Sequence, residues 1–328
     1  MNIGLAFVLS LLFSTVPTAK DEQTESIASV KPLIGSNDTE QNPNQDVEAL
    51  DLNMPPGSEI MLFDIESNGQ SIQFINGKNI SQAVGYDSQP KFSIDGKYIY
   101  YTHHVNGQMD IYQYEVSNGQ RLAYMATKES EYSPTPLPES DGLSVIQVDD
   151  KGNQYVVILD REAKKDHRVQ RYSDFKQLGY FNWTEGQNLW SFVLNDTAGG
   201  DLYLQGGDKN PIKILDHIGR SFIVDKKYKT LFFVDKNPQP WRIKSVQAED
   251  TLVKDVMPLP DGVEDFTLDS KGRFWAGRGN TLFVSSNQQR WFIAKEFDLP
   301  GLSQISRIST NPSGTKIAIV FAETPHNE

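Results

Sequence analysis

The chain has 328 residues, of which 31 are Lys or Arg and 43 are Asp or Glu, so its formal net charge is −12. It contains no cysteine, which excludes disulfide-stapled folds, cysteine-ligated zinc and iron–sulfur sites, thiol nucleophiles and anchors attached through a lipidated cysteine. The acidic balance argues against a nucleic-acid partner, because affinity for a phosphate backbone needs clustered Lys and Arg. The length suffices for one large all-β domain or for two ordinary ones.

Residues 1–19 have the pattern of a cleaved signal peptide. The apolar run at 5–13 is too short to span a bilayer, which needs about 20 residues. Small and polar residues follow it up to Ala19, and charged residues begin at Lys20. The sequence therefore predicts a periplasmic or secreted protein without a transmembrane segment or a lipid anchor. A buried N-terminal strand or helix is the alternative.

Residues 20–57 are polar and acidic, with Lys20 and Lys31 against eight Asp and Glu residues. Such a segment buries too little apolar surface to offset the entropy lost on ordering it. We expect an acidic disordered linker here. A tail that folds on contact with a partner is the alternative.

After Gly57, short runs of strand-forming residues alternate with turn residues, and no helical period occurs. Two interleaved series of turns each recur about every 40–50 residues, and a repeat of that length with two hairpins is one four-stranded antiparallel sheet. The predicted fold class is therefore all-β, a six-bladed β-propeller over 58–323 with a tail at 324–328. The first series lies near Gly96, Gly142, Gly186, Lys229, Gly272 and Gly314, and the second near Gly69, Gly119, Lys164, Asp208, Glu249 and Gln288.

The order of the turns predicts how the ring closes. The chain enters the propeller with a hairpin of the second series at Gly69 and leaves it with one of the first series at Gly314. One blade must then combine the N-terminal and C-terminal strands. This arrangement pairs edge strands that would otherwise expose N–H and C=O groups.

One repeat carries a recognisable motif, PKFSIDGKYIY at 90–100, followed by DIY at 110–112 and Asn118-Gly119. This pattern resembles the propeller repeat of the TolB-like family of periplasmic proteins, and NPSGTK at 311–316 is a partial second match. The resemblance implies a six-bladed propeller and an envelope location, but no established reaction. TolB itself has an α/β domain before its propeller, which the polar linker cannot supply. A role in envelope translocation is therefore in doubt.

Seven side chains are the candidate ligand-binding residues. Both hairpins of a repeat lie on one face, the hairpin face, so the other loops and the starts of the inner strands share the opposite face, the loop face. Charges there could hold a charged ligand or a peptide terminus. The alternative is that they only pair with one another across a solvated channel. The candidates are Asp87, His103, Glu131, Arg220, Asp265, Arg278 and Arg307.

No catalytic residue, metal site or cofactor is predicted. The sequence lacks a G-x-S-x-G nucleophile elbow. His103 and His104 are adjacent on an expected strand and so point to opposite faces, which disfavours a shared metal ion. Oxygen-rich segments at 149–153 and 195–201 are interpreted as β-turns rather than calcium loops.

These observations favour an exported, non-catalytic binding or scaffold propeller over an enzyme. Its expected partner is a protein, peptide or glycan of the cell envelope, held at the loop face or in the central channel, and the oligomeric state stays open. The alternative is a hydrolase or lyase acting on a glycan or lactone through rim carboxylates and His103 or His104. The family resemblance alone adds a third possibility, an envelope assembly factor.

Overall fold

The computed structural model describes residues 55–324, apart from 69–70, 84, 139, 160–168, 173–174, 176, 185–187, 197–198, 207–209, 226 and 228. The predicted signal peptide lies outside these residues, as do most of the predicted linker and residues 325–328 of the tail. A search of the described part of the chain finds no helix with the length and hydropathy needed to cross a membrane.

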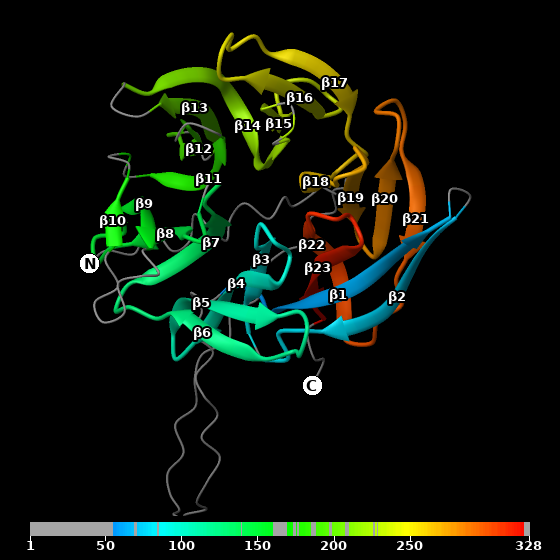
Figure 1. Ribbon diagram of the computed structural model, residues 1–328. Coiled ribbons are helices and arrows are strands. Elements are labelled where there is room, and N and C mark those ends of the chain that lie inside the picture. The colour runs from blue at the N-terminus through cyan, green and yellow to red at the C-terminus, as the bar shows by residue number, and fades with distance from the viewer. Residues whose placement is uncertain are drawn as a thin grey trace, which may run out of the picture.

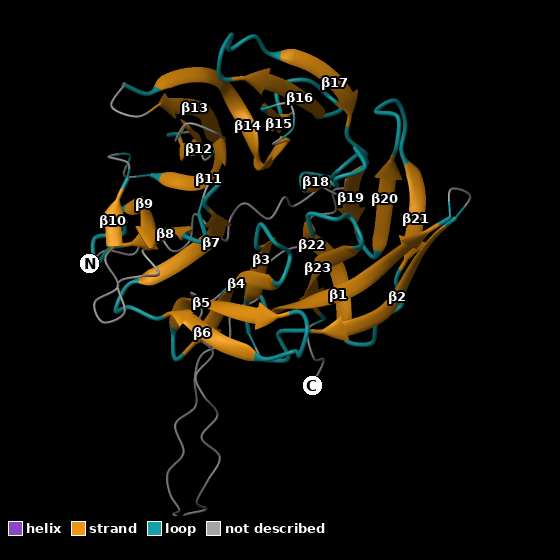
Figure 2. Ribbon diagram, viewed as in Figure 1, coloured by secondary structure: helices purple, strands orange, loops and turns teal. Residues whose placement is uncertain are grey.

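The described chain is an all-β propeller, in which antiparallel sheets surround a central axis (Figures 1 and 2). Four of its sheets have four strands each, ordered here from the axis outward. One contains β3 (Asp87–Phe92), β4 (Tyr98–Val105), β5 (Gln108–Glu115) and β6 (Arg121–Met125). The next contains β7 (Ser130–Pro136), β8 (Leu143–Val148), β9 (Gln154–Leu159) and β10 (Val169–Arg171). A third contains β18 (Phe266–Leu268), β19 (Phe274–Arg278), β20 (Thr281–Ser285) and β21 (Phe292–Glu296).

The fourth of these sheets closes the ring with strands from both ends of the propeller, which confirms the predicted closure. It contains β22 (Leu302–Thr310), β23 (Lys316–Glu323), β1 (Ser58–Ser67) and β2 (Ile72–Asn79). The β1–β23 ladder runs antiparallel from Ser58 opposite Ala322 to Asp64 opposite Lys316. Lys316 also pairs with the Asp64 carboxylate, so an ion pair reinforces one end of the ladder.

The remaining strands form one seven-stranded sheet, so the described residues contain five sheets and not the predicted six. The difference lies in the long strand β14, which pairs with β13 up to Ile218 and with β15 from Ile218 onward. It bends at His217, where φ is 50°, instead of ending there. The sheet contains β11 (Leu178–Thr184), β12 (Asn188–Leu194), β13 (Gly200–Gly206), β14 (Ile212–Asp225), β15 (Thr230–Asp235), β16 (Arg242–Gln247) and β17 (Lys254–Pro258).

The turns at the ends of the inner strands explain the repeat seen in the sequence. In the turn after β18, Asp269 Oδ1 accepts backbone N–H groups of Lys271 and Arg273 at 2.9 and 3.0 Å. Gly272 in the same turn has φ 76°, a conformation that costs glycine little. In the turns after β3, β18 and β22, an acidic or amide side chain followed by glycine therefore ends the strand on the hairpin face.

Aromatic side chains fill the wedges between neighbouring sheets. Between the closing sheet and the β18–β21 sheet, Phe297 packs on Phe63 and Phe321 with ring centroids 5.0 and 5.4 Å apart. Trp275 in the same cluster is fully buried. Burial of such side chains stabilises the fold by about 1.5–3 kcal/mol each, which explains the aromatic runs in the strands.

We expect Ile319→Ala to lower the free energy of unfolding by about 2–5 kcal/mol, because it opens a cavity in the closing sheet. Ile319 is fully buried on β23, opposite Met61 on one side and Ile308 on the other. Urea denaturation checks this. The control is Ile293→Ala on the outer strand β21, where the side chain is 62% exposed and the expected change is within about 0.5 kcal/mol. Equal effects at the two positions would contradict the buried closure.

Candidate functional site

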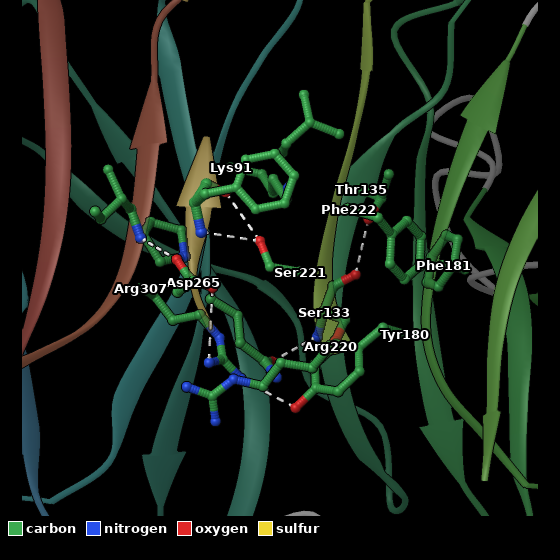
Figure 3. Close-up of a pocket in the computed structure, with 15 residues that line it drawn as sticks. Lys91, Ser133, Thr135, Tyr180, Phe181, Arg220, Ser221, Phe222, Asp265 and Arg307 are labelled. Carbon is green, nitrogen blue, oxygen red and sulfur yellow. Dashed lines mark hydrogen bonds and ion pairs between the residues drawn. The ribbon is translucent and has the colours of Figure 1, made fainter. Parts of the chain in front are cut away.

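Side chains from all six inner strands line a channel along the axis. These strands are β3, β7, β11, the second half of β14, β18 and β22. Figure 3 shows side chains that line the narrow part of the channel. Its volume is about 60 Å³, room for a few water molecules only. Three of the predicted residues, Arg220, Asp265 and Arg307, line it.

Hydrogen bonds from side chains join neighbouring inner strands around the channel, and we call the residues that make them the polar belt. Each bond spans 40–45 residues, which is one repeat of the sequence. The belt therefore holds neighbouring inner strands at a fixed spacing around the channel. The bonds run from Ser133 N–H to Gln89 Oε1 (2.8 Å), from Asn182 Nδ2 to the Phe222 carbonyl (3.3 Å), from Ser221 Oγ to the Phe266 carbonyl (2.9 Å) and from Ile308 N–H to Asp265 Oδ2 (2.8 Å).

Arg307 and Asp265 form the centre of the narrow part. The Nη1 atom of Arg307 lies 3.9 Å from Asp265 Oδ1, and its Nη2 atom donates to the Tyr180 hydroxyl at 3.0 Å (Figure 3). Burial raises the pKa of Asp265, although the nearby Arg307 and Arg220 lower it. The guanidinium of Arg307 thus crosses from β22 to β11 and holds two partners at once.

A second paired group surrounds Arg220. Glu264 Oε1 accepts the backbone N–H of Arg220 at 2.9 Å, and its Oε2 lies 4.0 Å from the Arg220 Nε. Lys236 Nζ lies 3.5 Å from the same carboxylate. Glu264 therefore bridges two cations.

The wider part of the channel opens on the hairpin face, with a volume of about 690 Å³. The sequence analysis expected the binding site on the loop face or in the central channel, and the larger of these two cavities lies at the hairpin-face end of the channel. Lys91, Thr135 and Ile223 line both the narrow and the wide part.

Asp87 and His103 meet at the loop-face end of the first complete sheet. Asp87 Oδ1 lies 2.7 Å from His103 Nδ1, and Asp87 has no exposed surface. Burial raises the pKa of Asp87, and the contact with His103 opposes that change. The His103 ring also lies edge-on to Tyr112, with centroids 4.3 Å apart. Neither Asp87 nor His103 lines the two cavities described above.

Glu131 is a second buried carboxyl near the loop face. It accepts hydrogen bonds from Thr127 Oγ1 and from Gln147 Nε2, the latter at 3.2 Å. Burial raises its pKa to about 7, the hydrogen bonds oppose this, and the nearby Asp110 adds to it. Near neutral pH this carboxyl therefore holds a proton part of the time.

Arg278 lies apart from the other candidates. It is exposed, donates to the Asp261 carbonyl at 3.2 Å and stacks over the Phe283 ring at 5.5 Å. The structure thus brings Arg220, Asp265 and Arg307 together at the channel, pairs Asp87 with His103, and leaves Glu131 and Arg278 apart from both groups. Residues that the sequence analysis missed include Lys91 and Tyr180. Lys91 stood inside the recognised motif, at the variable position between Pro90 and Phe92.

The described residues contain no group of three or more His, Asp or Glu side chains arranged to hold a metal ion. No protein-family model matches the chain, and no curated protein sequence matches it.

Solved structures do resemble the chain. A putative TolB from Agrobacterium tumefaciens has a TM-score of 0.61 and 15% identity, covering 82% of this chain and 99% of that one. TolB from Acinetobacter baumannii has a TM-score of 0.53 and 12% identity, covering 83% of this chain but 66% of that one. A gluconolactonase from Xanthomonas campestris has a TM-score of 0.53 and 13% identity, covering 82% and 98%. The chain has a TolB-like β-propeller fold. Identities this low establish the fold of the propeller alone.

We expect the stability of the propeller to fall as the pH rises from about 5 to about 7.5, and Glu131→Gln to reduce that fall. The folded protein holds the Glu131 proton up to about pH 7, whereas an unfolded glutamate loses it near its model value of 4.5. The protonated Glu131 therefore stabilises the folded state fully at pH values below its pKa in the unfolded chain. This stabilisation, up to about 3 kcal/mol, is lost as the pH rises through its pKa in the folded protein. Urea denaturation at several pH values measures it.

The matched control for that experiment is Glu66→Gln, which changes an exposed glutamate on β1. Its stability should follow the wild-type pH curve. Parallel pH curves for the wild type and Glu131→Gln would show that Glu131 does not hold a proton in the folded state.

Proposed function

We propose that this TolB-like propeller is an exported binding protein that holds a peptide, protein or glycan of the cell envelope in its axial channel. The wide cavity carries the proposal. Its volume of about 690 Å³ falls in the range of small-ligand sites, and rigid strands and short turns form its walls. A partner protein would insert a loop or a chain terminus into the same opening.

Two further parts of the proposal concern organisation. The proposal that the protein is exported rests on the signal-peptide pattern at 1–19. We also infer that the two halves of β14 serve consecutive blades, because they pair with β13 and β15 respectively. Counted this way, the propeller has six blades, in agreement with the six inner strands that line the channel.

The pairing of the channel charges supports binding more than catalysis. Arg307 holds Asp265 and Tyr180, and Glu264 bridges Arg220 and Lys236. A general acid or base must exchange a proton with the substrate, which a carboxylate held between cations does poorly. Such fixed charges can still orient a polar ligand.

A bulky side chain at Ile223 should block the channel, because Ile223 lines both of its parts. We expect Ile223→Trp to abolish binding of ligands found by a thermal-shift and NMR screen of envelope glycans and peptides. The control is Leu122→Trp on the outer strand β6, where the side chain is 53% exposed and binding should persist. A screen without any ligand, or ligands that bind Ile223→Trp as well as wild type, would exclude the channel.

The alternative function, a hydrolase or lyase acting on a glycan or lactone, has its own supporting observation. His103 and Asp87 lie 2.7 Å apart, and the pKa of Glu131 is raised to about 7. A histidine oriented by a carboxylate can act as a general base. The solved structures with this fold include one named as a gluconolactonase.

Lactone opening tests this alternative. If it is right, the wild type opens glucono-δ-lactone faster than the uncatalysed reaction, and His103→Gln loses about 100-fold or more of that acceleration. Lys97→Gln, an exposed position on the hairpin face, should leave the rate unchanged. A wild-type rate equal to the uncatalysed one, or equal rates for the wild type and His103→Gln, would exclude the alternative.

A further inference from the structure

Lys91 is a cation of the channel that has no bonded partner among the described residues. It lies near the end of β3, at the level where the narrow and wide parts meet, and it is half-buried. Within the described part of the chain, no hydrogen bond or ion pair engages its ammonium group. A partly desolvated ammonium without such a partner is costly, so its position requires an explanation.

The charges that face Lys91 leave this part of the channel positive. Arg307 on β22 and Arg220 on β14 add two further cations, and Asp265 before β18 is the nearest carboxylate. Asp265 already accepts a hydrogen bond from the Ile308 N–H and lies 3.9 Å from Arg307. Glu264 is paired with Arg220. Strand β7 contributes the uncharged Ser133 and Thr135 and β11 the Tyr180 phenol. Three cations therefore stand against two carboxylates.

The direction of the pKa change at Lys91 agrees with this excess of positive charge. Burial lowers the pKa of the Lys91 ammonium, Asp265 raises it, and Arg307 lowers it again. An anion placed beside the ammonium would reverse that change.

The wide cavity continues the same sign of charge toward solvent. Lys227 and Lys271 stand at its rim, against Asp225 and Asp269. Asp269 is already neutralised by Arg273, whose Nε donates to its Oδ2 at 2.7 Å. The cavity therefore has a cationic excess, although the whole chain carries a net charge of −12. A local positive opening in an acidic protein draws in anions that the rest of the surface repels.

The walls between these charges are partly apolar. Phe92, Ile223, Val224 and Leu268 line the cavity, together with hydroxyl and amide side chains such as Thr267 and Asn182. Such a lining suits a ligand that has an acidic head and a larger body with both apolar and hydroxyl groups.

We propose that the channel takes a small organic anion, whose carboxylate or phosphate head contacts Lys91 and whose body fills the wide cavity. This inference rests on the proposed binding function and names the ligand class of the same cavity. The anion would supply the missing partner of Lys91 in a charge-assisted hydrogen bond, which is stronger than a neutral one. A lysine ammonium is a point charge, so its geometry admits a carboxylate as well as a phosphate.

Isothermal titration calorimetry on the full mature chain tests the proposal. The probes are D-galacturonate and D-gluconate as carboxylates, glucose 6-phosphate as a phosphate, and glucose as the neutral control. We expect at least one anion to bind, glucose not to bind, and Lys91→Gln to weaken the anion about tenfold or more. Lys91→Arg, which keeps the charge, should retain part of the affinity.

The matched control is Lys97→Gln, which removes an exposed lysine in the turn after β3, outside the cavity lining. It should bind the anion as wild type does. A comparison of the carboxylate and phosphate probes then identifies which acidic head the site prefers. Thermal unfolding of each variant confirms that it is folded.

Other outcomes overturn the inference, and they separate it from the proposed function. If no anion binds, Lys91 is not an anion site. The same conclusion follows if the Lys91→Gln variant binds anions with the same affinity as the wild type. A neutral ligand that binds both forms equally but fails to bind Ile223→Trp would preserve the channel function and remove the anion from it. A chain that binds no ligand of either kind would lose both proposals.

Discussion

The pairing of β1 with β23 is the constraint on which the rest of the structure depends. It joins the two ends of the propeller through one antiparallel ladder, from Ser58 opposite Ala322 to Asp64 opposite Lys316. Without it, β1 and β23 would each present an unpaired edge, and the sheets could spread from the axis. Because the ring is closed, the inner strands keep fixed distances, and side chains of the polar belt can bridge them. The channel is therefore a property of the closed ring and not of any single sheet.

The sequence predicts most of the fold because its turns have strict local requirements. Gly96, Gly272 and Gly314 adopt φ values of 73°, 76° and 65°, which other residues rarely adopt, so they recur and reveal the period. The continuity of strand β14 could not be predicted in this way, because the residue at its bend, His217, is neither glycine nor proline. The two sheets that it joins therefore looked separate in the sequence.

The candidate site was less predictable than the fold, and backbone irregularities are the reason. In a regular strand, successive side chains point to opposite faces of the sheet, so the sequence alone assigns each residue to a face. Strand β3 breaks this rule, because its pairing is irregular between Ser88 and Lys91 and Gln89 has φ 57°. Such a bulge shifts the alternation and redirects the following side chains. Lys91 consequently lines the channel, although the motif around it marks its position as variable. A similar irregularity lies between Tyr132 and Thr135 on β7. Arg220, Asp265 and Arg307 were found because the spacing of the turns placed these charged residues on or beside inner strands, a placement that does not depend on alternation.

The two ends of the axis differ in a way that separates their chemistry. At the loop face, Asp87 and Glu131 are buried carboxyls whose pKa values are raised, so they hold protons more tightly than free acids do. On the hairpin side, Lys91 is an ammonium whose pKa is lowered, so it releases its proton more readily. Both effects begin with burial, yet only Lys91 lines a cavity large enough for a ligand. An anionic ligand could stabilise the charged form of Lys91, whereas Asp87 and Glu131 do not line either of the two cavities. The hairpin side is therefore where ligand binding and protonation can be coupled, and the loop face is where pH acts on stability.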